Sequence, residues 1–134
     1  MAKELKGKIL VDCTNPVGPN LSHSLNSSQS SAEVFQKLLP ETRVVKAFNT
    51  HGYENIENNV YPDYNVKPAM MFCGQDATAK ATVRGLIEQL GWEPLDVGGI
   101  EQALYLEHMT LLWVRMVRRN GLSPNLAWAM LTRK

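Results

Sequence analysis

The sequence has few of the features that mark secreted, membrane or nucleic-acid-binding proteins. Its 134 residues contain only two cysteines, Cys13 and Cys73, and neither stands at a spacing typical of a metal site or a redox pair. The 14 basic and 13 acidic residues leave a formal net charge of +1, too small a global field to attract nucleic acid or an anionic membrane. The amino terminus lacks the apolar core of a secretory signal, and no apolar run could span a bilayer. We therefore expect a cytoplasmic globular protein with reduced, buried thiols.

Two apolar runs followed by asparagine organise the first half of the chain. Residues 8–13 precede Thr14-Asn15-Pro16, and residues 43–48 precede Asn49-Thr50-His51-Gly52. Between them, Ser30 and Glu33 fit a capping box that begins a helix ending before Pro40, whereas residues 20–31 predict a mobile surface loop. A strand, a helix and a strand form a right-handed crossover, so both runs should be neighbouring parallel strands. Their carboxyl ends would meet at one ligand crevice.

The second half predicts two further strands and several helices. Residues 68–74 are almost wholly apolar, which is typical of a parallel strand covered on both faces, and residues 54–67 should be a long loop over the strand ends. Asp76 begins a helix that ends at Gly91 and places Ala79, Val83, Leu86, Ile87 and Leu90 on one face. Residues 92–97 predict an edge strand, because a proline cannot donate to a central ladder.

The helix predicted over residues 100–120 is apolar on nearly every side, so part of it should meet another subunit. Residues 124–131 predict a short final helix that folds back on it. The expected architecture is an α/β unit of about four parallel strands over residues 1–99. A C-terminal α-helical region, residues 100–134, should follow it and form an oligomer interface.

Several separated motifs carry a resemblance to a known family. The chain resembles the dinucleotide-binding enzymes related to coenzyme F420-dependent NADP oxidoreductase and to the cytoplasmic oxidoreductase domain of STEAP metalloreductases. The matching motifs are Val-Asp-Cys-Thr-Asn-Pro (11–16), Ser-Ser-Ala-Glu (30–33), Val-Val-Lys-Ala-Phe-Asn-Thr (44–50), Cys-Gly-Gln-Asp-Ala-Thr-Ala-Lys (73–80), Pro-Leu-Asp-Val-Gly (94–98) and Tyr-Leu-Glu (105–107).

The resemblance implies a Rossmann-like fold, NADP as the cofactor and hydride transfer as the chemistry. Asn15, Pro16, Asn49 and Thr50 would border the nicotinamide ribose and ring, and the backbone of His51 and Gly52 would lie near the carboxamide. No residue is needed as a catalytic acid, because hydride transfer requires only that two rings be held face to face. The F420-using branch has histidine where this chain has Asn49, so the position that supports the deazaflavin ring is not matched. The second substrate stays open between a deazaflavin such as F420, a flavin and another compound.

The resemblance covers only the later part of the family. Members begin with a strand and a Gly-rich turn that holds the pyrophosphate, and these 134 residues contain no GxGxxG. We therefore expect weak NADP binding and an unpaired edge at residues 8–13. That edge should pair with another chain, either a second copy in a homo-oligomer, with strands exchanged between copies, or a partner that carries the Gly-rich half.

Two functions stay open. The chain could be the distal part of an NAD(P)-dependent oxidoreductase that is not competent alone, or an oligomerising binding module without hydride transfer. A nucleophilic site of Cys13, His51 and Asp12 is disfavoured, because Asp12 and Cys13 would point to opposite faces of one strand. His23 and His108 have no partner at metal-ligand spacing and should face solvent or form hydrogen bonds, so no metal site is expected.

Overall fold

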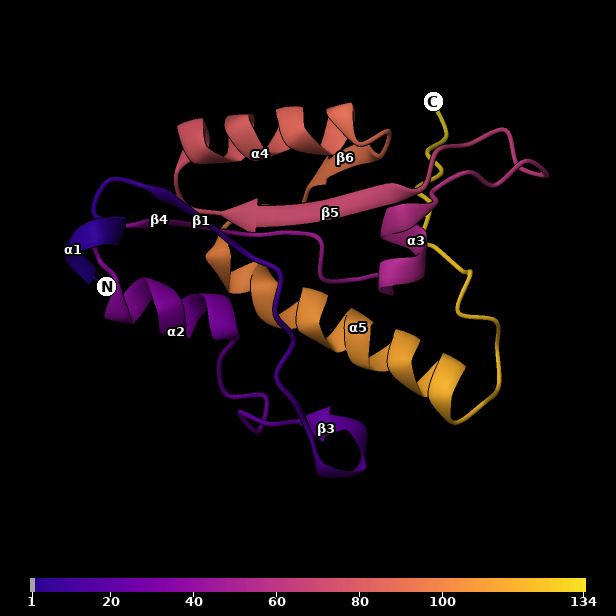
Figure 1. Cartoon of the computed structure of the whole chain (residues 1–134), viewed down its shortest axis with the longest axis horizontal. Coiled ribbons are helices and arrows are strands. Elements are labelled where there is room, and N and C mark those ends of the chain that lie inside the picture. The colour runs from indigo at the N-terminus through magenta and orange to yellow at the C-terminus, as the bar shows by residue number, and fades with distance from the viewer. Residues whose placement is uncertain (1) are drawn as a thin grey trace.

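A four-stranded sheet between two layers of helices forms the centre of the computed structural model, which describes residues 2–134 (Figure 1). The strands lie in the order β1 (Ile9–Asp12), β4 (Arg43–Lys46), β5 (Ala69–Gly74) and β6 (Glu93–Asp96). Helix α4 (Ala77–Gln89) covers one face, and α2 (Ser31–Leu38) and α5 (Ala103–Arg118) cover the other. A short helix, α1 (Ala2–Leu5), precedes β1. The predicted α/β class and the strand number are confirmed.

The sheet is mixed, so the prediction of an all-parallel sheet is wrong at one place. β1 is parallel to β4 and β5 is parallel to β6, but β4 and β5 are antiparallel, with Val45 opposite Gly74. A parallel neighbour needs a crossover, usually a long helix, that carries the chain back across the sheet. The polar segment after β4 forms only the five-residue helix α3 (Tyr53–Glu57) and a loop, so β5 begins at the edge where β4 ends.

The predicted helix starts are confirmed, but the apolar face of α4 is narrower than expected. The Ser30 hydroxyl accepts from the Glu33 amide while the Glu33 carboxylate accepts from the Ser30 amide, which completes the capping box of α2. Asp76 is the N-cap of α4, and its side chain accepts from the Ala79 amide at 2.7 Å. Within α4, Ala79, Val83 and Ile87 form the buried stripe that faces the sheet. Leu86 and Leu90 project beside this stripe and are 44% and 53% exposed.

The core lies on both faces of the two central strands, as alternation along a strand requires. Val45 belongs to the cluster under α4, and its neighbour Val44 belongs to the cluster under α2 and α5. Cys73 is buried in the second cluster, as predicted. Cys13 is exposed, against the prediction, because β1 ends at Asp12 and the next side chain points outward.

Two further segments differ from expectation. The predicted loop 20–31 contains the end of a 3-10 turn, η1 (Pro19–Leu21), and the strand β3 (Ser22–His23). β3 pairs with β2 (Val17–Gly18), which lies just before that loop, in a small hairpin. Residues 124–131 form no helix and run extended past the start of β5. We call residues 124–129 the C-terminal tail. The Trp128 amide donates to His51 Nε2 and its carbonyl accepts from the Ala69 amide, so neither backbone group is available for a helical hydrogen bond.

The long C-terminal helix is confirmed with shorter bounds, as η2 (Ile100–Gln102) followed by α5. One side of α5 is buried, while Tyr105 and Leu112 on its other side are 66% and 52% exposed. No helix within residues 2–134 is both long and apolar enough to cross a membrane.

Candidate nicotinamide site

Two asparagines join the loops that follow β1 and β4. The side-chain amide of Asn15 donates to the Asn49 carbonyl, and the Asn49 amide donates to the Asn15 side-chain oxygen, each at 3.0 Å. The pair forms because β1 and β4 are parallel neighbours and end at the same edge of the sheet. We call it the asparagine pair. The structure therefore brings together two of the residues that the sequence placed in one crevice.

Helix α5 holds Asn49 from the other side. The Thr110 hydroxyl donates to the Asn49 carbonyl at 2.7 Å, so both lone pairs of that carbonyl are engaged. The chain turns sharply just before, since Phe48 has a φ of 60°, a left-handed conformation that non-glycine residues adopt at some energetic cost. Asn49 is 2% exposed, and its Oδ1 atom has no hydrogen-bond partner among residues 2–134. A buried acceptor left without a donor costs about 1–3 kcal/mol, so a donor from a ligand or a water molecule would be favoured there.

Thr50 and His51 are engaged by the C-terminal tail. The Trp128 indole donates to the Thr50 carbonyl, and the Trp128 amide donates to His51 Nε2, both at 3.1 Å. Since Nε2 accepts, the proton of the imidazole lies on Nδ1, which donates to the Thr50 hydroxyl. Burial lowers the pKa of His51 to about 4, so the ring is neutral at pH 7.

Gly52 and Pro16 complete the six predicted site residues. A Cβ atom at Gly52 would lie 2.5 Å from the Trp113 ring, so glycine is required for α3 to approach α5. Pro16 is half-buried beside Asn15. The asparagine pair and Pro16 lie just beyond the carboxyl ends of β1 and β4, while Thr50, His51 and Gly52 join that edge to the C-terminal tail and to α5.

Sequence reasoning missed a buried ion cluster next to the asparagine pair. It consists of Lys46 on β4, Asp12 on β1 and Glu107 on α5, whose side chains are all 0% exposed. Lys46 Nζ lies 2.9 Å from Asp12 Oδ2 and 2.8 Å from Glu107 Oε1. Burial alone would raise the pKa of Asp12, but the charge of Lys46 and the hydrogen bonds from Lys46 and Thr14 outweigh it and lower the pKa below its usual value. The signal available in the sequence was a charged residue inside each apolar run.

His23 extends this cluster toward the surface. Its Nε2 atom lies 2.7 Å from Glu107 Oε2, and its Nδ1 atom accepts from the Ser27 amide. The residue is 5% exposed, so of the two expectations for His23 the hydrogen-bonded one is confirmed. The His108 ring stacks on it at a centroid distance of 5.4 Å. Over the described chain, no group of three or more His, Cys, Asp or Glu side chains could hold a metal ion.

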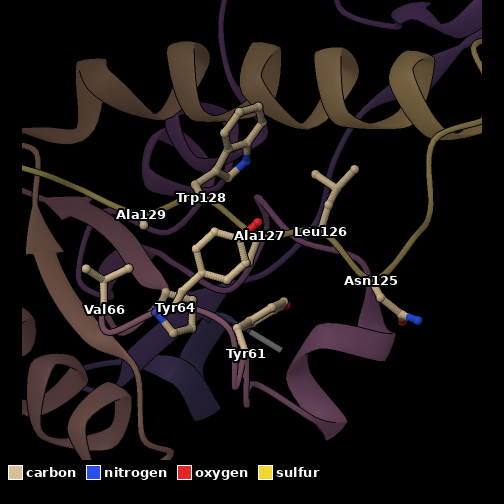
Figure 2. Close-up of a pocket in the computed structure, with 9 residues that line it drawn as sticks. Tyr61, Tyr64, Val66, Asn125, Leu126, Ala127, Trp128 and Ala129 are labelled. Carbon is tan, nitrogen blue, oxygen red and sulfur yellow. The ribbon is translucent and has the colours of Figure 1, made fainter.

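Three surface cavities, of about 270, 370 and 400 Å³, lie elsewhere, because neither asparagine of the pair lines any of them. Figure 2 shows the first, between the loop that carries Tyr61 and Tyr64 and the C-terminal tail. The indole of Trp128 points away from both tyrosine rings in this view. None of these three cavities therefore coincides with the predicted site at the asparagine pair.

Comparison with known proteins identifies relatives of this chain. No family model matches it. It is 32% identical over 123 residues to the F420-dependent NADP reductase of Methanocaldococcus jannaschii, a match that covers 85% of this chain and 52% of that protein. It is 35% identical over 111 residues to metalloreductase STEAP3 of Rattus norvegicus, covering 83% of this chain and 22% of STEAP3. The chain is a homologue of these reductases.

The fold of this reductase homologue agrees with the sequence match. A crystal structure from Arthrobacter sp. FB24, assigned as an F420-dependent NADP reductase, superposes with a TM-score of 0.84 at 30% identity, over 98% of this chain and 60% of that one. A hypothetical protein from Sinorhizobium meliloti gives a TM-score of 0.64 at 27% identity, over 71% and 47% of the two chains. The predicted resemblance and the Rossmann-like fold are thus confirmed. The homologue spans about half the length of the NADP reductase and about a fifth of STEAP3.

Proposed function

We propose that this chain supplies the nicotinamide side of the cofactor site in an NADP-dependent oxidoreductase. The asparagine pair at the carboxyl edge of β1 and β4 is the observation that carries the proposal. Asn49 is fixed through its carbonyl by Asn15 and Thr110, and its Oδ1 atom is a buried acceptor without a donor. Such an acceptor fits the amide N–H group of a nicotinamide carboxamide. The NADP reductase homologue supports the choice of cofactor.

The contribution of the protein is positioning. NADP supplies the hydride chemistry when it is bound. Asn15, Pro16 and Asn49 would hold the ring and ribose in one orientation, because their loops are tied to each other and to α5. The Thr50 carbonyl and His51 Nε2 are occupied by Trp128, so the backbone of His51 and Gly52 is what these residues could offer to the carboxamide.

The phosphate contacts of the cofactor need a second unit. A Gly-rich strand, turn and helix has no counterpart within these 134 residues. β1 is the last strand of the sheet formed by residues 2–134 and has a neighbour, β4, on one side only. We propose that a further strand, from this protein or from a partner chain, pairs with β1 and brings the phosphate-binding turn to the asparagine pair.

The second candidate function is an oligomerising or binding module without hydride transfer. If these 134 residues act without a Gly-rich turn, the absent phosphate contacts should weaken cofactor binding by several orders of magnitude. Exposed Tyr105 and Leu112 on α5 would then belong to an interface between copies. Light scattering tests this interface, and a stable monomer at high concentration would count against it.

Titration with NADP and NAD, followed by tryptophan fluorescence, tests the first function. Asn49→Ala should weaken binding at least tenfold, because it removes the buried acceptor and the bond to Asn15. Asn59→Ala is the matched control, since Asn59 bonds to the Leu90 carbonyl at an exposed position. Equal affinity of wild type and Asn49→Ala would refute the assignment of the site.

A further inference from the structure

Lys46 is the centre of a buried network that touches five elements of the fold. Its Nζ atom lies within hydrogen-bond distance of Asp12 Oδ2, the Thr14 carbonyl, Ser31 Oγ and Glu107 Oε1, at 2.9, 2.5, 2.8 and 2.8 Å. Strands β1 and β4, the loop after β1 and helices α2 and α5 all meet at this one ammonium group. An ammonium has three protons to donate, so each is committed to a partner inside the protein.

The network holds the loop that carries Asn15. The amide and hydroxyl of Thr14 both donate to Asp12 Oδ1, at 2.9 and 2.7 Å. The Thr14 carbonyl accepts from Lys46. Every polar group of Thr14 is therefore bonded to a charged member of the cluster, and the next residue along the chain is Asn15. The position of Asn15 depends directly on Asp12 and Lys46.

The network also holds the groups that fix Asn49. Glu107 accepts from Lys46 and from the Ser31 amide, at 2.8 Å each, and so locks α5 against α2 and β4. Thr110 lies one turn further along α5 on the same side, and its hydroxyl donates to the Asn49 carbonyl. Lys46 itself precedes Asn49 by three residues. Both asparagines are thus placed by the same buried ions.

The charge of the cluster does not cancel. Asp12 accepts from Thr14, Ser31 and Lys46, and Glu107 accepts from Ser31 and Lys46, so both side chains act as carboxylates. Lys46 supplies one ammonium opposite them. His23 accepts from the Ser27 amide through Nδ1, so in this arrangement its ring carries one proton, on Nε2, and is neutral. His108, stacked on His23, is exposed to solvent. Two negative charges and one positive charge leave one negative charge in excess.

We propose that the Asp12, Lys46 and Glu107 cluster positions the asparagine pair and, by its net negative charge, makes the site prefer the positively charged oxidised nicotinamide ring to the neutral reduced ring. The inference rests on the proposed function. Asp12 and Lys46 stand three residues before Asn15 and Asn49, so their Cα atoms lie within about 11 Å of those of the pair. A unit charge at about 10 Å, with an effective dielectric constant of about 20, changes a binding ratio roughly tenfold.

A stabilising role alone would not explain charged residues at these positions. Buried ion pairs are often replaced by apolar side chains of similar size without loss of stability, because their attraction barely offsets their desolvation. Apolar side chains could not place four oxygen atoms around Lys46 Nζ, and they would leave no net negative charge beside the asparagine pair. Positioning and charge preference are therefore the measurable properties to test.

The first measurement needs no ligand. Side-chain amide signals of Asn15 and Asn49 in NMR spectra of the full chain should shift, and exchange with solvent faster, in Glu107→Gln and in Ser31→Ala. The indole N–H signal of Trp92, buried in the other core cluster, should stay in place. Two variants are used because Ser31→Ala keeps every charge and Glu107→Gln keeps the shape. Unchanged asparagine signals in both variants would overturn the positioning role.

The second measurement compares affinity for NADP and for NADPH. Glu107→Gln removes the excess negative charge, so its ratio of NADP to NADPH affinity should fall about tenfold relative to wild type. Asp96→Asn is the matched control, because Asp96 pairs with Lys80 at the partly exposed opposite edge of the sheet and its loss should leave the ratio unchanged. A merely structural role for Glu107 would weaken both ligands equally, and an equal loss would overturn the charge preference. If wild type bound neither ligand, the proposed function and the charge preference would both fail, while the NMR comparison would still decide the positioning role.

Discussion

Protonation of His51 should break the bond that joins it to the C-terminal tail and lower the stability of the fold in acid. His51 Nε2 accepts from the Trp128 amide and the side chain is packed against the Trp92 ring, so a second proton has neither a partner nor water. Burial lowers the pKa of His51 from 6.5 to about 4. Because the pKa is depressed in the folded state, the stabilisation is fully present above about pH 6.5 and is lost as the pH falls toward 4.

The magnitude follows from that difference in pKa. Linkage between protonation and folding gives a loss of about 2 kcal/mol between pH 7 and pH 5, and about 3 kcal/mol by pH 4. The range from pH 7 to pH 5 is preferred for the experiment, since most carboxylates keep their charge there. Asp12 in particular has a lowered pKa and should stay ionised across this range.

Urea unfolding of wild type and of His51→Gln at pH 7 and pH 5 measures the effect. Glutamine keeps a side-chain acceptor for the Trp128 amide but does not titrate, so the variant should lose about 2 kcal/mol less than wild type on acidification. His108→Gln removes an exposed histidine and should behave as wild type. The same pH dependence in wild type and His51→Gln would refute the reasoning.

Two further predictions concern stability and use urea unfolding at pH 7. Lys46→Met should cost about 3–5 kcal/mol, because it leaves two buried carboxylates without a counter-charge, whereas Lys80→Met, which removes a partly exposed pair, should cost at most about 1 kcal/mol. Similar losses in the two lysine variants would contradict the buried network. Gly52→Ala should destabilise by about 1–3 kcal/mol, since its methyl group would collide with the Trp113 ring, while Gly85→Ala in the open interior of α4 should stabilise by about 0.5–1 kcal/mol. A neutral Gly52→Ala would show that α3 does not approach α5 as closely as described.

The two asparagines show how far the candidate site could be predicted from sequence. Each follows a short apolar run, and a capped helix connects the runs, so a parallel pair of strands with both asparagines at one edge was the expected result. The hydrogen bonds between Asn15 and Asn49 agree with it. No pattern in the sequence indicated that Trp128, at the far end of the chain, would occupy the Thr50 carbonyl and the His51 ring.

Local sequence determines the features that depend on residues adjacent in the chain. The capping box of α2, the Asp76 N-cap of α4 and the end of α2 before Pro40 depend on a few adjacent residues and are local in origin. Tertiary structure alone decided the direction of β5, the extended path of the tail and the partners of Lys46. Glu107 lies 61 residues from Lys46 in the chain, and no local preference selects one distant carboxylate from the 13 acidic residues available. The buried position of the Lys46 ammonium exists only because β1, β4, α2 and α5 pack together. There the side chains of Asp12, Ser31 and Glu107 and the Thr14 carbonyl surround the ammonium and offset the free energy of its desolvation.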